Sequence, residues 1–316
     1  MKQLISYYRM PGDREEDILR MTRDAGLDGV EMLVYGTKPA ARPFTKVTGG
    51  AHLKFWPYWM DFYRGDTARL AKSFRTEEEI RACYGGVTVD DWIETQRNNI
   101  QAALAEKPAY LVWHVQEATT EEAWTWQFHY SDWDVLEASA EVYHACQDLI
   151  PDGVRVLFEN IFWPGLYKME PEKIDWFFTK VNDDSHTGIM FDTGHFMNTV
   201  PDLTTEEEGA RAIEAMAKQL GSLTECIRGI HLSCSTSGVY RRTFRRVMPQ
   251  PCTQTDIYTH ITSIDQHRPF ETDAARRIAE AIQPGVVVHE IFGKTFAQAI
   301  ERTMGQKRQL RMKNAE

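Results

Sequence analysis

The sequence predicts a single (β/α)8 barrel with extended loops at the carboxyl ends of its strands. Short apolar runs alternate with amphipathic stretches along the chain, eight such runs can be counted, and 316 residues suffice for one barrel of this kind. No glycine- or serine-rich linker divides the chain, and no G-x-G-x-x-G motif follows an early strand. We therefore assign residues 1–305 to the barrel and residues 306–316 to a basic C-terminal tail.

The first βα unit carries the clearest local signals. Residues 4–8 (LISYY) form a strand, Asp13 and Glu16 have the spacing of a capping box, and Gly26 ends the helix that follows. Residues 28–35 form the second strand. The segment after it contains two prolines and no helical stripe, so we expect the second crossover helix to be missing or very short.

Strands and helices then alternate more regularly, after a third strand within residues 47–56 and an aromatic-rich loop. The further strands are predicted at residues 109–115, 154–160, 187–195, 227–233 and 286–292. The further helices are predicted from Asp91 onward and at residues 133–150, 171–181, 205–220, 272–282 and 294–304. Pro171 suits the first turn of its helix.

Composition limits the function classes. The chain has 36 Lys and Arg against 46 Asp and Glu, a net charge of -10, which disfavours a generally basic nucleic-acid-binding surface. We see no signal peptide and no run of membrane-spanning length. The five cysteines are widely spaced without a C-x-x-C pair, as expected of reduced thiols. These features predict a cytoplasmic protein without a membrane partner.

Polar side chains follow the predicted strands where the strands end. In a parallel barrel these ends converge on one face, so residues far apart in sequence meet there. The residues concerned are His52, His114, Glu159, Asp192, His231 and Glu290, with His195 three positions after Asp192. Carboxylates and imidazoles in this arrangement are the ligand set of a divalent metal site.

The alternative is that these residues are ordinary solvated or salt-bridged groups, as a single glutamate at a strand end commonly is. Four in register are harder to explain in that way, because an uncompensated buried carboxylate costs several kcal/mol. We favour a metal site made of Glu159, Asp192, His231 and Glu290. Asp265 and His267 could also share an ion, although that signal alone is weak, and His289 should point the opposite way from its neighbour, toward the helices.

Seven motifs, in this order and spacing, resemble the xylose-isomerase-like TIM-barrel superfamily, which joins sugar and sugar-phosphate isomerases and epimerases with the endonuclease IV group. They are DGVEM, LVWH, LFENIFWPG, FDTGH, GIHLS, DQHRPF and VVHEI. The resemblance covers residues 1 to about 305 and implies a (β/α)8 TIM barrel. It implies one catalytic divalent ion, Mn, Zn, Co or Mg, held by Glu159, Asp192, His231 and Glu290.

The two branches of the superfamily differ in what else they imply. In the isomerases, His195 lies beside the substrate. In the endonuclease branch, the resemblance implies two additional metal sites, made of His195, Asp265 and His267 and of His52, His114 and Glu159. This sequence has candidates for all of these positions.

Our first hypothesis is a sugar or sugar-phosphate isomerase or epimerase that works through an enediolate. Glu159 and Glu290 would transfer the proton and His195 would orient a hydroxyl. The substrate would be bound by Trp113, His114 and Arg268. The small-molecule partner would be a carbohydrate or sugar phosphate, and a homo-oligomer is left open.

The alternative is a multinuclear zinc phosphodiesterase of the endonuclease IV type. Against it, HVQEA replaces the small turn of the endonucleases, and the tryptophans that follow (Trp124, Trp126 and Trp133) suit a closed pocket or simple packing under a loop. Arginines of the YRRTFRR segment could hold a phosphate, although a solvated charged turn is the commoner case. A third hypothesis is a noncatalytic sugar-binding barrel.

Overall fold

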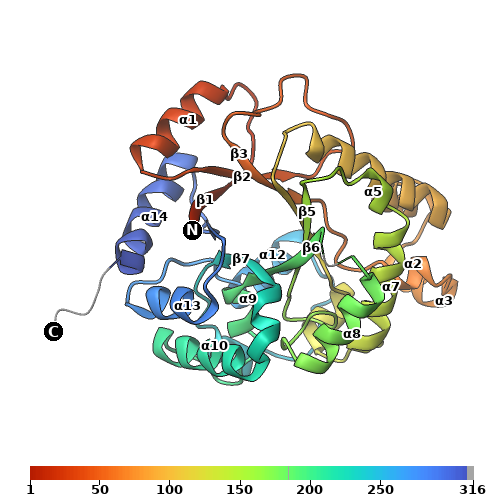
Figure 1. Ribbon diagram of the computed structural model, residues 1–316. Coiled ribbons are helices and arrows are strands. Elements are labelled where there is room, and N and C mark those ends of the chain that lie inside the picture. Colours follow the sequence, from red (N-terminus) through yellow and green to blue (C-terminus); the bar gives the residue numbers. More distant parts are fainter. Residues whose placement is uncertain (184, 312–316) are drawn as a thin grey trace.

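The computed structural model describes residues 1–183 and 185–311, in which eight parallel strands close into a barrel in the order β1 to β8. Figure 1 looks along this barrel, with the strands in the middle and helices around them. The strands are β1 (Lys2–Tyr7), β2 (Gly29–Val34), β3 (Thr48–Leu53), β4 (Tyr110–His114), β5 (Arg155–Glu159), β6 (Thr187–Asp192), β7 (Ile227–Leu232) and β8 (Val286–His289). The predicted (β/α)8 barrel is confirmed.

Seven helices surround the barrel, and each follows a strand as predicted. They are α1 (Glu15–Asp24), α5 (Val89–Leu104), α7 (Asp132–His144), α8 (Pro171–Val181), α10 (Glu206–Leu220), α13 (Ala274–Ile282) and α14 (Phe296–Arg311). No helix joins β2 to β3 among the described residues, which agrees with the prediction. Pro171 is the first residue of α8.

The predicted capping box at the start of α1 is wrong. The helix begins at Glu15, and its N-cap residue, Arg14, makes no side-chain cap. The Asp13 carboxylate is instead used by the preceding turn, where it accepts hydrogen bonds from the Tyr7 hydroxyl and the Met10 amide.

The predicted tail boundary at residue 306 also lies inside a helix, because α14 continues to Arg311. Gln306 and Lys307 are buried there: Gln306 donates to the Leu232 carbonyl oxygen and to His289 Nδ1, and Lys307 donates to the Ala25 carbonyl oxygen. His289 therefore faces the helices, as predicted. The rest of the predicted tail, residues 312–316, lies outside the described residues.

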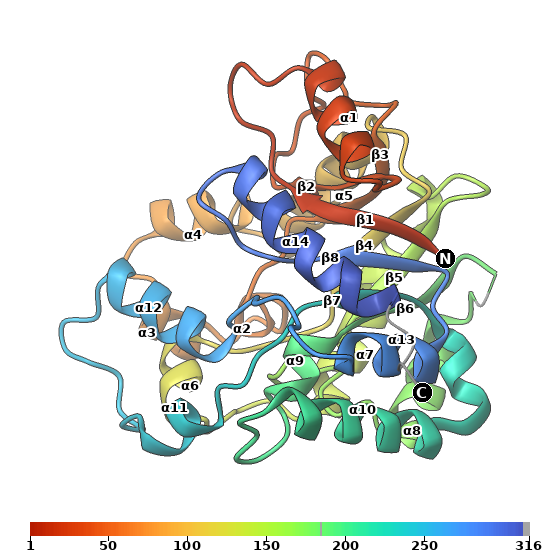
Figure 2. The same cartoon turned by 90° about the vertical axis from the view of Figure 1, so that its left-hand side faces the viewer.

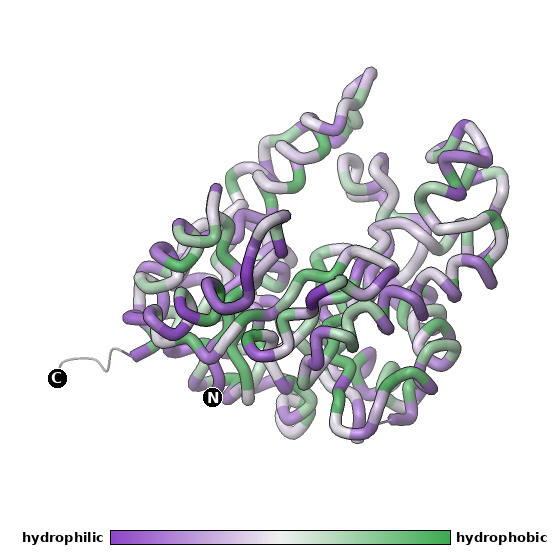
Figure 3. Tube along the Cα trace, turned by 90° about the horizontal axis from the view of Figure 1, so that it is seen from above, coloured by the Kyte–Doolittle hydropathy of each residue, from purple (hydrophilic) through white to green (hydrophobic). Residues whose placement is uncertain are grey.

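Several short helices were not predicted, and most of them have too few residues to show a helical period. They are α2 (Met60–Tyr63), α3 (Thr67–Ser73), α4 (Glu77–Tyr84), α6 (Thr120–Thr125), α9 (Thr193–Met197), α11 (Gly238–Thr243) and α12 (Gln254–Ile264). All but α9 and α2 clearly project beyond the carboxyl ends of the strands in Figure 2. Apolar stretches run through these excursions as well as through the barrel (Figure 3). No described helix has the length and apolarity needed to cross a bilayer.

Side chains alternate between the barrel interior and the surrounding helices, as the pleat of a strand requires. The interior is filled by a small apolar cluster, whereas the alternate residues join the larger core beneath the helices. The interior cluster consists of Leu4, Tyr110, Val112, Leu157, Met190, Val286 and Val288. The same alternation then fixes which side chains face inward at the strand ends.

The Tyr110 ring crosses the interior only because residue 50 is a glycine. A Cβ built at Gly50 would lie 2.1 Å from Tyr110 Cζ, which is far inside van der Waals contact. The Tyr110 hydroxyl reaches the Glu31 carboxylate on β2 at 2.8 Å. Gly50 thus allows a polar contact across the centre of the barrel.

We predict that Gly50→Ala lowers the free energy of unfolding by about 1–3 kcal/mol, because the added methyl group overpacks the interior against Tyr110. Chemical denaturation measures this. Gly305→Ala on α14 is the control, since its Cβ would meet nothing nearer than an arginine side chain at 3.8 Å. That control should be neutral or more stable by up to about 1 kcal/mol. Equal stability of Gly50→Ala and the wild type would contradict the packing described.

The excursion that contains α2 is attached to the barrel by a buried carboxylate. Glu117 Oε2 accepts hydrogen bonds from the Trp59 amide at 2.7 Å and the Met60 amide at 3.1 Å. Burial, reinforced by nearby Glu122 and Asp61, raises the pKa of Glu117 to about 8 in spite of these hydrogen bonds. The folded protein therefore keeps a proton here that the unfolded chain releases near pH ~4.3.

This raised pKa gives a pH-dependent stability whose sign is fixed by linkage. The contribution of Glu117 is complete at low pH and is lost as the pH rises through about 8. Glu117→Gln removes the ionisation, so the difference in stability, variant minus wild type, should grow between pH 5 and pH 8 by up to about 1.4 kcal/mol per pH unit. Denaturation at several pH values measures it. A difference independent of pH would show that Glu117 ionises freely.

Candidate metal centre

The inward-facing residue at the end of each strand from β3 to β7 is a histidine or a carboxylate. Val112, Leu157 and Met190 belong to the interior cluster, so the side chains two positions later on the same strands also face inward. The strand register then pairs neighbours at one level: His114 lies beside Glu159, and Asp192 beside His231. Glu290 directly follows β8, with Val286 and Val288 inside the barrel.

Nine predicted residues are brought together at this mouth, in three groups whose ligand atoms lie within 4.8 Å of one another in each group. The central group is Glu159, Asp192, His231 and Glu290. The two outer groups are His52, His114 and Glu159, and His195, Asp265 and His267. We call these the central, first outer and second outer groups.

Glu159 belongs to two of these groups. Its Oε2 lies 3.2 Å from His52 Nε2 and 3.1 Å from His114 Nε2 in the first outer group. Its Oε1 lies 3.1 Å from His231 Nδ1 in the central group and 3.3 Å from His195 Nδ1. The two oxygens of one carboxylate therefore face different groups.

The second outer group is built around Asp265. Its Oδ2 lies 2.6 Å from His267 Nε2 and 3.3 Å from His195 Nε2. Asp265 ends helix α12, and His195 lies on α9, which directly follows β6. Asp192 starts α9 by accepting a hydrogen bond from the His195 amide, so the predicted strand 187–195 ends at Asp192. The short helix turns His195 toward Asp265.

The donor set fits divalent cations. Three buried carboxylate oxygens, Asp192 Oδ2, Asp265 Oδ1 and Glu290 Oε2, have no hydrogen-bond partner among the described residues. The carboxylates of the three groups make ion pairs with histidines only. Among the described residues, none of them pairs with a lysine or arginine. Buried carboxylates without cationic side chains require another positive charge.

The electrostatics show the same need. Burial, together with Glu290 and Glu159, raises the pKa of Asp192 to about 8. Burial lowers the pKa of His267, but Asp265 and Glu290 overcome this and raise it to about 9. Against its burial, the neighbouring histidines hold the pKa of Glu159 well below its usual value. Protons on the imidazoles thus take the place that divalent ions fill in such donor sets.

Backbone carbonyl oxygens fix two of the histidine rings of the outer groups. His52 Nδ1 donates to the Leu53 carbonyl oxygen at 2.9 Å, and His195 Nδ1 donates to that of Asn160 at 2.9 Å. Since a carbonyl oxygen only accepts, Nδ1 carries the proton in these rings and Nε2 is left to bind an ion.

Glu31 is a site residue to which the sequence analysis assigned no role. It is fully buried on β2, and its Oε1 accepts a hydrogen bond from His231 Nε2 at 2.8 Å, while Oε2 accepts that of the Tyr110 hydroxyl. This contact leaves His231 Nδ1 facing the central group. The available signal was a glutamate in the middle of an otherwise apolar strand, where a buried carboxylate needs a partner.

Two residues predicted to bind substrate, Trp113 and Arg268, lie outside the three ligand groups. Trp113, whose role in substrate binding stays a prediction, faces outward and packs against Tyr143 and Phe158 in the large core. The reason is the alternation that points its neighbour His114 inward. Arg268 is exposed next to His267, where its guanidinium contacts Thr236.

The tryptophans expected near the pocket pack within the excursions. Trp124 stacks on His260 of α12 with ring centroids 3.8 Å apart, and Trp133 packs against Trp176 of α8. The arginine-rich segment is also engaged internally, because Arg241 donates to the Val200 carbonyl oxygen and Arg242 pairs with Asp202. These side chains therefore pack against other parts of the protein, which is the alternative to lining a pocket.

We predict that Glu31→Gln weakens metal binding about 10- to 100-fold, because the neutral amide orients and polarises His231 less well than a carboxylate. Competition with a chromophoric chelator measures the affinity. Tyr110→Phe is the graded control, since it keeps the contact between Glu31 and His231 and removes only the second hydrogen bond; it should have a smaller effect. Unchanged affinity in Glu31→Gln would contradict the role assigned to the Glu31 carboxylate.

Comparison with known proteins gives matches of structure only. No protein-family model matches the sequence, and no curated protein matches it significantly. The structure superposes on endonuclease IV from Thermus thermophilus with a TM-score of 0.56 at 11% identity, over 98% of this chain and 99% of that one.

Two sugar-processing enzymes superpose at a similar level. D-allulose 3-epimerase from Methylomonas sp. gives a TM-score of 0.51 at 11% identity, over 97% of this chain and 96% of that one. Mannonate dehydratase from Streptococcus suis gives 0.51 at 12% identity, over 98% and 94%. The chain therefore has the same barrel fold as these enzymes, which is the (β/α)8 fold that its motifs predicted.

Proposed function

We propose that the protein is a divalent-metal-dependent hydrolase of phosphate esters with a multinuclear centre. The observation that carries this proposal is the presence of three adjacent ligand groups at one mouth. Isomerisation through an enediolate needs an ion only in the central group, so the two outer groups would hold no metal in it, and of their residues only His114 and His195 would contact the substrate. Their ligand sets combine imidazole and carboxylate, which suits zinc or manganese.

Sharing of Glu159 supports a multinuclear centre in particular. A carboxylate whose Oε1 and Oε2 face different groups could serve as a ligand in both groups. Closely spaced divalent ions, when bound, lower the pKa of water and neutralise charge on a phosphoryl oxygen. Isomerisation of a carbonyl substrate does not require a pair of closely spaced ions.

The chain's own residues divide the remaining work. The side chains of Glu159 and Asp192 are at most 1% exposed, which suits them to hold ions in such a hydrolase. The Glu290 side chain is 12% exposed and its Oε2 has no hydrogen-bond partner among the described residues. Glu290 is thus the carboxylate of the central group best placed to accept a proton, and exposed Arg268 is suited to a phosphate oxygen.

A small phosphate ester fits this mouth better than a duplex does. Helices α3, α4, α6, α11 and α12 stand beyond the strand ends on one side (Figure 2), where they would obstruct a long rigid substrate. The net charge of -10 also opposes binding to a polyanion. We propose a cytoplasmic location, with which the five cysteines, none in a disulfide, agree.

The second candidate is the sugar or sugar-phosphate isomerase or epimerase. The central group favours it, because Glu159 Oε1 and Glu290 Oε2 lie 3.1 Å and 3.3 Å from the same His231 Nδ1 and could exchange a substrate proton beside one ion. In that case Glu159→Gln should abolish exchange of a substrate C–H proton with deuterium oxide, and His195 would orient a hydroxyl.

Metal content and turnover separate the two candidates. Elemental analysis of the zinc-loaded protein should give three ions per chain, and bis(p-nitrophenyl) phosphate should be hydrolysed. Asp265→Ala and His52→Ala should each lose about one ion and at least about 10²-fold in rate, because each removes a ligand of one outer group. The surface variant His186→Ala should keep three ions. One ion per chain, with deuterium exchange into a ketose, would establish the isomerase instead.

A further inference from the structure

Exposed apolar side chains gather on one half of the mouth. Of the eleven large hydrophobic residues exposed in the described chain, five follow the ends of four consecutive strands, β8, β1, β2 and β3. We call these five the rim arc: Tyr8, Met10, Tyr35, Phe55 and Phe292. The helical excursions that follow β3, β4 and β7 occupy the rest of the rim. Contiguous exposed apolar surface beside a polar site usually marks a binding region.

The rim arc is continuous with the outer ligand groups. Phe55 stacks on His114 with ring centroids 4.3 Å apart at 10°, and Phe292 stacks on His267 at 4.1 Å and 18°. Between these pairs lies His195, 6.1 Å from each histidine. The five rings form a row across the mouth, with an accessible phenylalanine at each end: Phe55 is 37% exposed and Phe292 49%.

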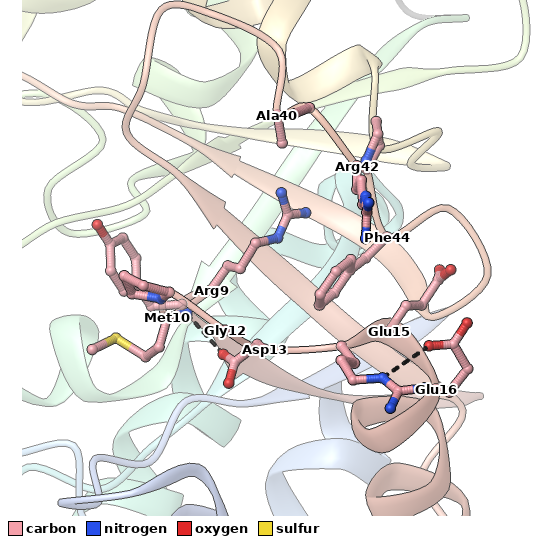
Figure 4. Close-up of a pocket in the computed structure, with 14 residues that line it drawn as sticks. Arg9, Met10, Gly12, Asp13, Glu15, Glu16, Ala40, Arg42 and Phe44 are labelled. Atoms are coloured by element: carbon pink, nitrogen blue, oxygen red, sulfur yellow. Dashed lines mark hydrogen bonds and ion pairs between the residues drawn. The ribbon is translucent and has the colours of Figure 1, made fainter.

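The arc also continues outward into a pocket. Tyr35 lies 6.3 Å from Phe55 and 5.9 Å from Tyr8, measured between ring centroids. Tyr8 and Met10 are in turn part of the lining of a pocket of about 1010 Å³ between the loop after β1 and residues 40–44. Figure 4 shows Arg9 and Met10 on one wall of this pocket and Ala40, Arg42 and Phe44 on the other. A phosphate alone would leave this surface unused.

We propose that the rim arc binds the organic half of the substrate, and that this half carries a planar aromatic ring. The inference rests on the proposed function, because it takes the phosphate to lie at the ligand groups. Phenyl rings with accessible surface stack on planar aromatic rings whatever the substituents of those rings. Such stacking gives affinity for an aromatic ligand without hydrogen bonds. The phenylalanine at either end of the row lies next to a ligand histidine, so a ring attached to the phosphate through a short linker reaches it.

Two of the three arginines that line this pocket lie beside carboxylates. Arg9, which lines the pocket, is paired with Glu106 at 2.6 Å and lies over the Phe44 ring at 4.2 Å. Arg14 lies 4.0 Å from Glu16. Arg42, the third of them, has no ion pair among the described residues, so a cation is available in the pocket, whereas the five side chains of the rim arc are themselves apolar or aromatic.

The test compares two phosphate monoesters that differ by one ring. On the zinc-loaded protein, calorimetry should show adenosine 5′-monophosphate binding at least about tenfold tighter than ribose 5-phosphate. In the double variant Phe55→Ala/Phe292→Ala the two affinities should differ by less than about twofold, with the affinity for ribose 5-phosphate and the zinc content unchanged. Trp133→Ala is the matched control, because Trp133 is also 37% exposed and lies away from the row; it should keep the difference.

Three results would overturn the inference. Equal affinity of the wild type for both compounds would remove the aromatic subsite and leave the proposed hydrolase standing. Loss of zinc in Phe55→Leu/Phe292→Leu, which keeps apolar bulk, would show that the rings only support their histidines. Failure of both phosphates to bind the zinc-loaded chain would remove the proposed function together with the subsite.

Discussion

The structure of the mouth depends on one buried carboxylate, that of Glu159. Its two oxygens lie within 3.3 Å of four histidines that come from four different parts of the barrel. An anion in this position is tolerable only because positive charge surrounds it, as protons on imidazoles or as bound cations. The histidines are in turn held by contacts that point away from Glu159, such as that of His231 with Glu31. Removal of the central charge would leave the surrounding groups uncompensated.

The barrel provides this arrangement through simple geometry. Strand alternation selects the inward-facing residues, and closure brings β3 and β8 to the same mouth. Below the polar level, apolar side chains fill the interior, with Tyr110 reaching across the space that Gly50 leaves open. The polar groups are therefore confined to one end of a dry core, where charges interact strongly. The three groups of histidines and carboxylates in this environment could hold metal ions.

Periodicity predicted much of this from the sequence. The eight strands and seven outer helices follow from apolar runs and amphipathic stretches, and the site residues from their position at strand ends. Short helices of the excursions, such as α2 and α3, escaped prediction because four to seven residues cannot establish a period. Glu31 escaped because its importance comes from a contact 200 residues away. Trp113 faces the surrounding helices because its neighbour on the strand, His114, faces inward.

The preference for a hydrolase over an isomerase depends on contacts that the sequence does not show. Spacing alone could not show that Asp265 lies against His195, or that both oxygens of Glu159 are engaged. The most direct test of this account is anomalous diffraction at the zinc edge from crystals of the loaded protein. The account predicts three peaks, one in each ligand group; a single peak, confined to Glu159, Asp192, His231 and Glu290, would contradict it.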